Sequence, residues 1–193
     1  MNAIPPRPFL FLRHGETDWN REGRFQGATD VPLNEAGLAQ AQAAAERIAG
    51  QSVTAVVTSP LVRASKTAEI VAARLECPVH VDHRLAERSF GRFEGRIVRE
   101  VKRELGVGPG ERLADLGLLP PDAEPWPATV ARTSAVVAKW LDLLPSDRLL
   151  FVSHLGLFEA LCHDLCGSRF EGRHAVPYLF RPAGEGWRVD EIG

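Results

Sequence analysis

The sequence predicts an α/β fold, a mostly parallel sheet with helices on both faces. Two wholly apolar runs, Phe9–Leu12 and Leu149–Val152, are typical of strands that are buried on both sides. Short strand patterns also alternate with helical patterns along the chain, which is how parallel sheets are built. Ligands of such sheets bind beyond the carboxyl ends of the strands, so functional residues are expected there.

The first elements have clear boundaries. The strand Phe9–Leu12 is followed by a polar segment from Thr17 to Pro32, which we expect to be a loop. Asn34 then suits the N-cap of an alanine-rich helix, and Gly50 suits its end. The β-branched run Val53–Val57 predicts the second strand.

The second helix is predicted from its start signals. Ser59 can cap it and Pro60 suits its first position, which places Arg63 in the first turn. The helical pattern runs to about Leu75, and Cys77–Val81 reads as a short strand. An arginine at a helix start that follows a strand is well placed to bind an anion.

The rest of the chain alternates in the same way, with one irregular stretch. Leu85–Gly95 is expected to be a shaped loop, and residues 106–128, rich in Gly and Pro, a long connection or lid. Five further elements are expected: helices at Ile97–Leu105 and Thr129–Leu144, a helix from the end of Leu149–Val152 to about Leu165, and terminal strands at Val176–Arg181 and Trp187–Ile192. No linker divides the pattern, so we expect residues 1–193 to form a single domain.

Bulk properties narrow the function classes. A formal net charge of -2 gives no support to nucleic-acid binding through bulk charge. No apolar run approaches the roughly 20 residues of a membrane span, and Met1–Pro8 lacks an apolar signal core. The three cysteines, an odd number, suggest a reducing compartment and hence a cytoplasmic protein. Cys162 and Cys166 are one helical turn apart, but a structural zinc site needs four ligands, so we expect no metal there.

Three predicted strand ends carry residues suited to chemistry on phosphate. They are Arg13-His14, the segment from Ser59 to Arg63, and Ser153-His154, while Glu87 follows a further strand by a few residues. Parallel strands would bring these ends together. One imidazole can attack phosphorus, the other can bind its oxygens, and the arginines can neutralise the phosphate. A carboxylic acid can protonate the leaving oxygen. Because the cationic side chains supply the charge, we expect no metal or other cofactor.

The segment Leu12–Asn20 resembles the signature of the histidine phosphatase superfamily, the phosphoglycerate mutase-like proteins. Further landmarks follow in the family's order, at Gly23–Gly27, Asp30–Leu33, Thr58–Ala64, Leu85–Glu87, Gly91–Gly95 and Val152–His154. The resemblance implies a three-layer α/β/α fold and a small phosphorylated metabolite as substrate.

The resemblance also implies roles for individual residues. His14 is expected to become phosphorylated, with Arg13, Arg63 and His154 binding the phosphate and Glu87 donating the proton. Three positions of this chain are expected to contribute to phosphate or substrate binding as well: Asn20, Gln26 and Leu155.

Several nearby residues allow two interpretations. Gln26 stands where phosphatase members carry glutamine and mutases carry threonine, and it either contacts the phosphate or shapes its loop. Thr17 either donates to the substrate or caps local structure, and Glu16 is expected to orient Arg13 or its neighbours. Trp19 is expected to pack. Four histidines match no family landmark and are taken as surface or structural residues: His80, His83, His163 and His174.

Three features depart from the family pattern. Leu155 replaces the first glycine after the second histidine, so its side chain either narrows the phosphate pocket or shifts the backbone. Asp122–Pro127 replaces a Gly-Glu-Ser segment, and Trp126 either leans over the pocket or packs. Glu159 stands where many members have arginine, which removes positive charge from the pocket wall.

Three functions therefore remain. The first is a phosphomonoesterase that acts through a phosphohistidine on His14, the second is a phosphoglycerate mutase, and the third is a non-catalytic protein that binds a phosphorylated ligand. Gln26 and the short segment between Glu87 and His154 favour the phosphatase. No nucleic acid or membrane partner is expected. The oligomeric state stays open, a homodimer included.

Overall fold

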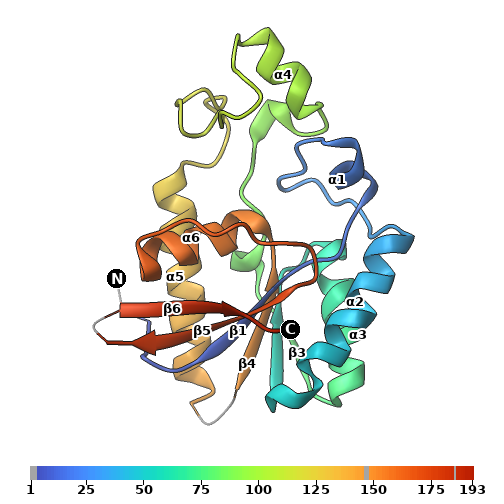
Figure 1. Ribbon diagram of the computed structural model, residues 1–193, viewed down its shortest axis with the longest axis vertical. Coiled ribbons are helices and arrows are strands. Elements are labelled where there is room, and N and C mark those ends of the chain that lie inside the picture. The colour runs from blue at the N-terminus through green and yellow to red at the C-terminus, as the bar shows by residue number, and fades with distance from the viewer. Residues whose placement is uncertain (1–3, 146–147, 185) are drawn as a thin grey trace.

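The computed structural model describes residues 4–145, 148–184 and 186–193, so the first three residues of Met1–Pro8 lie outside it. Its strands form one sheet in the order β3-β2-β4-β1-β5-β6 (Figure 1). Strands β1 to β4 run parallel, while β5 and β6 are antiparallel additions at one edge. The strands are β1 (Phe9–Arg13), β2 (Ala55–Thr58), β3 (Val79–Val81), β4 (Leu149–Ser153), β5 (Pro177–Ala183) and β6 (Gly186–Glu191). The predicted α/β class with a mostly parallel sheet is confirmed.

Helices cover both faces of this sheet, as predicted. They are α1 (Asp18–Glu22), α2 (Glu35–Ile48), α3 (Val62–Leu75), α4 (Val98–Glu104), α5 (Trp126–Leu143) and α6 (Leu155–Cys166). Figure 1 shows α2 and α3 on one side of the sheet, α5 and α6 on the other, and α4 beyond the end of the sheet. None of these helices is long and apolar enough to cross a membrane.

The alternation of side chains along β1 explains the two layers. Phe9 and Phe11 point to one face and join the core with α5 and α6. Leu10 and Leu12 point to the other face and join the core with α2 and α3. Because all four side chains are fully buried, β1 reads as a continuous apolar run.

In the first half of the chain, one helix was not predicted and another begins later than predicted. The segment Thr17–Pro32, predicted as a loop, contains the short helix α1, which is capped by Thr17 and Asn20 in a reciprocal capping box. Helix α3 begins at Val62, two residues after Pro60, because the Ser59 hydroxyl accepts the N–H of Leu61 and delays the first turn. Arg63 nevertheless lies in the first turn, as expected.

The irregular stretches are where they were predicted. Leu85–Gly95 forms a shaped loop with a short 3-10 helix at Gly91–Phe93. Residues 106–125 contain no helix or strand, and α5 begins at Trp126, three residues earlier than predicted, because Pro127 fits the first turn of a helix. The loop and the connection lie at the end of the sheet where β1 and β4 terminate, so both can reach a site there.

Two glycines bring the turn after β1 against the start of α2. A Cβ added to Gly37 would lie 2.0 Å from the carbonyl oxygen of Glu16, and one added to Gly15 would lie 2.3 Å from the carbonyl oxygen of Gly37. These are backbone atoms that cannot move aside independently. The small residues therefore allow α2 to approach the segment that carries His14.

We expect Gly37→Ala to lower the free energy of unfolding by about 2 kcal/mol, because overpacking outweighs the gain of roughly 1 kcal/mol in helix propensity. Urea unfolding measures the change. Gly50→Ala is the matched control, because a Cβ at Gly50 meets no atom within 4 Å. Its effect should stay within about 0.5 kcal/mol. Equal unfolding midpoints for the two variants would contradict the close approach of Gly37 to Glu16.

Candidate active site

Two neighbouring strands deliver the two predicted histidines to the same place. In the parallel β1–β4 pair, Arg13 lies opposite Ser153, so His14 and His154 are the next residues on each strand. Their ring centroids are 5.1 Å apart. The backbone N–H of His14 donates to the carbonyl of Ser153 over 2.9 Å. The convergence of strand ends that the sequence predicted is therefore present.

The imidazole of His14 is held in one orientation. Its Nδ1 lies 2.7 Å from the carbonyl oxygen of Gly15, and because a carbonyl only accepts, Nδ1 must carry the proton. The lone pair is then on Nε2. Burial, with added repulsion from Arg63 and Arg13, holds the pKa of His14 well below its usual value. A neutral ring with a free Nε2 is a potential nucleophile.

The two arginines bring positive charge that no carboxylate of the described residues contacts directly. Arg63 is fully buried and donates from Nη1 to the carbonyl of Thr29 (2.8 Å) and from Nη2 to that of Gly27 (2.7 Å). Arg13 donates from Nη1 to the carbonyl of Gly172 over 2.9 Å. Burial lowers the pKa of Arg63, and that of Arg13 to about 10, but both stay charged at neutral pH.

Three buried nitrogen atoms in this group have no hydrogen-bond partner within the described part of the chain. They are Nε of Arg13, Nε of Arg63 and Nδ1 of His154. The other ring nitrogen of His154, Nε2, lies 2.8 Å from the hydroxyl of Ser59. Buried polar groups are normally paired, and an anion with several acceptor oxygens would pair such nitrogens.

Glu87 is held by backbone groups beside this cluster. One carboxyl oxygen accepts the N–H of Arg88 (2.8 Å) and the other accepts the N–H of Gly156 (3.2 Å). Desolvation raises the pKa of Glu87, and these hydrogen bonds and Arg63 offset it only in part. A Cβ at Gly156 would lie 2.5 Å from a carboxyl oxygen of Glu87, so glycine as the second residue after His154 leaves room for this carboxyl group in its observed position.

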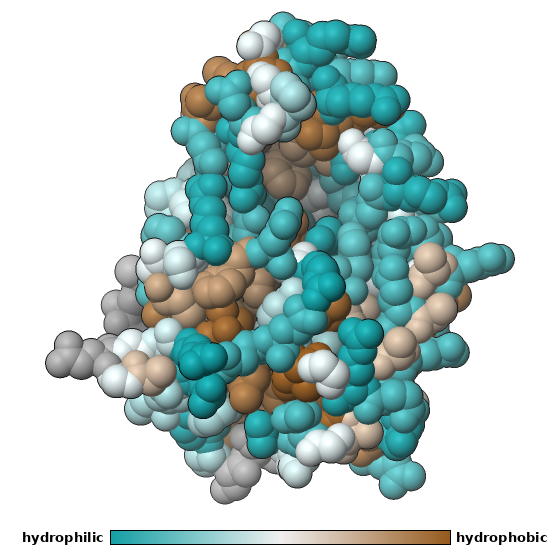
Figure 2. Space-filling model, in the orientation of Figure 1, coloured by the Kyte–Doolittle hydropathy of each residue, from teal (hydrophilic) through white to brown (hydrophobic). Residues whose placement is uncertain are grey.

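A cavity of about 670 Å³ opens onto these groups, a size that suits a small organic ligand. Its wall includes all the predicted site residues except His154, namely Arg13, His14, Asn20, Gln26, Arg63, Glu87 and Leu155. The wall also carries five large apolar side chains among several charged ones, namely Phe25, Phe90, Leu113, Leu119 and Trp126. In Figure 2, hydrophobic surface is visible within the recess below α4.

The structure decides several of the open alternatives. The hydroxyl of Thr17 caps α1 and donates to Oε1 of Gln26 over 3.0 Å, so Gln26 shapes the loop and faces the cavity as well. Of the expectation that Glu16 orients Arg13 or its neighbours, the described residues show a contact of the second kind, because its carboxylate accepts from Nδ2 of Asn34 at the start of α2. The ring of Trp19 packs against Gly95.

The structure also shows where the residues that depart from the family pattern lie. Leu155 and Trp126 both line the cavity, and the guanidinium of Arg88 lies over the Trp126 ring at 5.6 Å from its centroid. Glu159 binds Arg112 through two hydrogen bonds of 2.9 and 2.7 Å. Glu159 therefore neutralises a cation of the cavity wall. Within the described ranges, no group of three or more His, Cys, Asp or Glu side chains could hold a metal ion, and this includes the Cys162–Cys166 turn.

One histidine taken as surface or structural, His174, adjoins the site. Its Nδ1 donates to the carbonyl of His14 over 3.1 Å, and the ring centroids are 5.5 Å apart. Burial lowers the pKa of His174 to about 4. The feature that could have placed His174 beside His14 is the antiparallel pairing of β5 with β1, because the residues just before β5 must meet the end of β1.

Acid should therefore weaken the fold. As pH falls below about 6.5, the unfolded chain takes up protons on histidines that stay neutral in the folded chain, so stability is lost. With a folded pKa of about 4, His174 alone accounts for a loss of about 3 kcal/mol in the free energy of unfolding at pH 4 relative to neutral pH.

We expect His174→Asn to reduce the loss of stability between pH 7 and pH 4, as measured by urea unfolding at both pH values. The exposed His83 lies elsewhere, on the 3-10 helix His83–Leu85, so His83→Asn is the matched control and should leave the loss unchanged. An equal loss in wild type and His174→Asn would rule out a neutral buried His174.

Comparison with known proteins agrees with this geometry. The model of the histidine phosphatase superfamily, branch 1, matches residues 9–185. A probable phosphoglycerate mutase GpmB of Cronobacter sakazakii is 37% identical over 151 residues, covering 74% of this chain and 67% of the relative. An uncharacterized phosphatase PhoE of Bacillus subtilis is 34% identical over 156 residues, covering 81% and 76%.

Solved structures include a mycobacterial glucosyl-3-phosphoglycerate phosphatase in complex with VO3. It is 30% identical with a TM-score of 0.84, and the match covers 95% of this chain and 97% of that one. Bacillus stearothermophilus YhfR is 26% identical with a TM-score of 0.83, and coverage is 97% and 96%. The chain therefore belongs to branch 1 of the histidine phosphatase superfamily and is an enzyme of its phosphatase or phosphoglycerate mutase kind.

Proposed function

We propose that the chain is a phosphomonoesterase that hydrolyses a small phosphorylated metabolite through a phosphohistidine on His14. The observation that carries this proposal is the orientation of the His14 imidazole, whose Nδ1 donates to the Gly15 carbonyl and whose lone pair is therefore on Nε2, while burial lowers its pKa. Arg13 and Arg63 supply the positive charge that a phosphate dianion requires, so the reaction needs no metal ion. The vanadate and phosphate complexes of the mycobacterial phosphatase support a phosphorylated substrate.

The reaction proceeds in two transfers. In the first, Nε2 of His14 forms a bond to phosphorus as the ester P–O bond breaks, and the protonated Glu87 gives its proton to the leaving alkoxide. In the second, water attacks the phosphohistidine, Glu87 takes its proton, and inorganic phosphate leaves. Arg13, Arg63 and His154 bind the phosphoryl oxygens throughout, assisted by Asn20 and Gln26.

Gln26 and the short segment between Glu87 and His154 favour hydrolysis over the mutase reaction, and two of the cations on the cavity wall are already neutralised. A mutase must hold a substrate with a second anionic group, and this requires free cations away from the phosphate. Arg112 and Arg169 line the cavity, but each binds a carboxylate through two hydrogen bonds, Glu159 and Asp115 respectively. Arg88 and Lys102 also line it and bind backbone carbonyls, those of Glu124 and Pro109. A non-catalytic binding role is the least favoured, because it gives no purpose to a raised pKa at Glu87 beside a neutral His14.

We also propose that residues 1–193 act as one domain, since the cavity takes residues from Arg13 to Glu171. The three cysteines favour a cytoplasmic location.

The deciding experiment follows turnover and the covalent intermediate together. The chain is incubated with p-nitrophenyl phosphate, quenched in base, and assayed for acid-labile phosphoprotein. Turnover with trapped phosphohistidine is the expected result, and turnover without it would exclude the covalent route. Conversion of 3-phosphoglycerate to 2-phosphoglycerate that depends on 2,3-bisphosphoglycerate would instead favour the mutase.

A further inference from the structure

The loop that carries Glu87 is held by side chains from other elements. It lies between two short 3-10 helices, His83–Leu85 and Gly91–Phe93, so regular hydrogen bonding does not fix it. A proton donor must nevertheless be placed accurately, since a displacement of about 1 Å can cost roughly 100-fold in rate.

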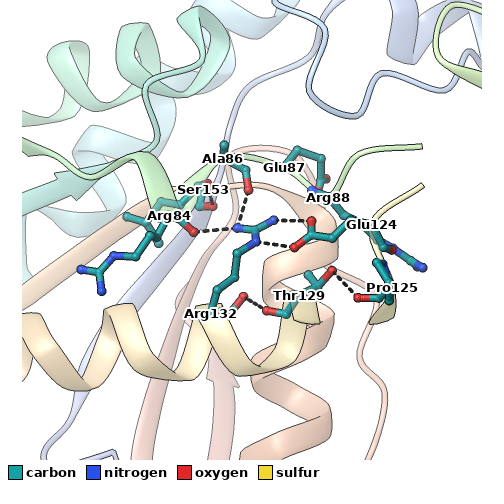
Figure 3. Close-up of polar contacts among 11 residues, drawn as sticks. Arg84, Ala86, Glu87, Arg88, Glu124, Pro125, Thr129, Arg132 and Ser153 are labelled. Atoms are coloured by element: carbon teal, nitrogen blue, oxygen red, sulfur yellow. Dashed lines mark hydrogen bonds and ion pairs between the residues drawn. The ribbon is translucent and has the colours of Figure 1, made fainter. Parts of the chain in front are cut away.

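Arg132, which projects from α5, binds this loop from below (Figure 3). Its Nη1 donates to the carbonyl of Arg84 (2.6 Å) and to that of Ala86 (2.8 Å). The hydroxyl of Ser153 on β4 donates to the carbonyl between them, that of Leu85, over 2.8 Å. Three successive carbonyls just before Glu87 are thus bound by two side chains from other elements.

Glu124 holds the guanidinium of Arg132 in place. Its carboxylate accepts from Nε (2.7 Å) and Nη2 (2.8 Å) of Arg132, a planar two-pronged arrangement that only arginine can form. The backbone of Glu124 binds the loop after Glu87 as well. Its N–H donates to the carbonyl of Ser89 (3.0 Å), and its carbonyl accepts from Nε of Arg88 (2.8 Å). The Arg132–Glu124 pair therefore contacts the loop on both sides of Glu87.

We propose that Arg132 and Glu124 are positioning residues for proton donation by Glu87. This inference rests on the proposed phosphatase function. Glu124 belongs to the irregular segment 106–125, which also supplies Leu113 and Leu119 to the cavity wall, so the same pair joins a part of that wall to the loop that carries the acid.

The proposal predicts an effect that depends on the leaving group. p-Nitrophenolate is a weak base and leaves without much help from an acid, whereas an alkoxide leaves only when it is protonated. A misplaced Glu87 should therefore lower kcat/KM, which reports only the first transfer, for alkyl phosphates and spare it for p-nitrophenyl phosphate. Loss of a purely structural contact would slow both substrates alike.

The test measures kcat/KM of Arg132→Lys for glycerol phosphate and for p-nitrophenyl phosphate. Lysine keeps the charge but cannot bind two carbonyls and a carboxylate at once. We expect a loss of about 100-fold with glycerol phosphate and less than about threefold with p-nitrophenyl phosphate. Vanadate inhibition should be unchanged, because Arg13 and Arg63 are not touched. The acid limb of the pH profile should also move, because the environment of Glu87 changes.

Two further variants make the result decisive. Glu124→Gln keeps the shape of the side chain and should show the same selective loss in smaller measure, which covers the case in which Arg132→Lys does not fold. Arg92→Lys is the matched control, because Arg92 is exposed and does not line the cavity, and it should behave as wild type. Equal losses on both substrates, or weaker vanadate inhibition, would overturn the positioning role while the phosphatase function stands. A wild-type chain that turns over neither ester would overturn both proposals.

Discussion

His14→Ala is expected to lower kcat/KM for p-nitrophenyl phosphate by on the order of 10⁴-fold or more and to abolish the acid-labile phosphoprotein. The substitution removes the atom that would bond to phosphorus. The hydrogen bond that the His14 side chain makes is to the adjacent carbonyl of Gly15, so the strand that carries it should fold as before. Stopped assays with base-quenched protein measure both quantities.

The His14→Ala variant should lose the chemical step and still bind phosphate. Arg13 and Arg63 remain, so inorganic phosphate should still inhibit residual activity or raise the melting temperature, within about tenfold of its wild-type affinity. His83→Ala replaces an exposed histidine outside the cavity and should keep full activity. Turnover of His14→Ala above about one per cent of wild type would contradict nucleophilic attack by this residue.

The parts of the fold that apolar patterns govern could be predicted from the sequence. Phe9–Leu12 and Leu149–Val152 are strands because four successive buried side chains serve two faces of a sheet. Once both were read as parallel strands, the meeting of His14 and His154 followed from geometry alone. The family signature then supplied Arg63 and Glu87, which the structure places on the wall of the same cavity.

The missed features depend on polar contacts between distant residues. Helix α1 has no buried residue and is held by the Thr17–Asn20 cap, so no apolar pattern marks it. His174 is 160 residues from His14 and reaches it through an antiparallel pairing that a single sequence does not display. Arg132 likewise contacts carbonyls 46 and 48 residues away, and backbone carbonyls leave no trace in residue identity.

The cationic wall of the site suggests a second large effect, that of Arg63→Met. We expect kcat/KM to fall on the order of 10³-fold and the affinity for inorganic phosphate to fall more than tenfold, because a fully buried guanidinium beside the phosphate site is removed. The kcat/KM and the phosphate affinity of Arg63→Lys should lie between those of Arg63→Met and wild type. An ammonium keeps the charge but lacks the planar two-pronged hydrogen bonding of a guanidinium. Phosphate inhibition of p-nitrophenyl phosphate turnover measures the affinity.

Arg63→Met should change the stability of the fold much less than it changes activity. Burial lowers the pKa of Arg63, which means that folding disfavours its charged form in the absence of an anion. Methionine removes that cost but leaves the carbonyls of Gly27 and Thr29 without their donor, and the two effects oppose each other. The free energy of unfolding should therefore stay within about 2 kcal/mol of wild type.

Ligand-induced stabilisation then distinguishes a phosphate-binding arginine from a structural one. Inorganic phosphate should raise the melting temperature of wild type and of Lys66→Met, an exposed position one helical turn further along α3. The same phosphate concentration should leave Arg63→Met almost unchanged. A full phosphate-induced shift in Arg63→Met would show that Arg63 serves the Gly27–Thr29 loop, and Arg13 with His154 would then have to bind the anion without it.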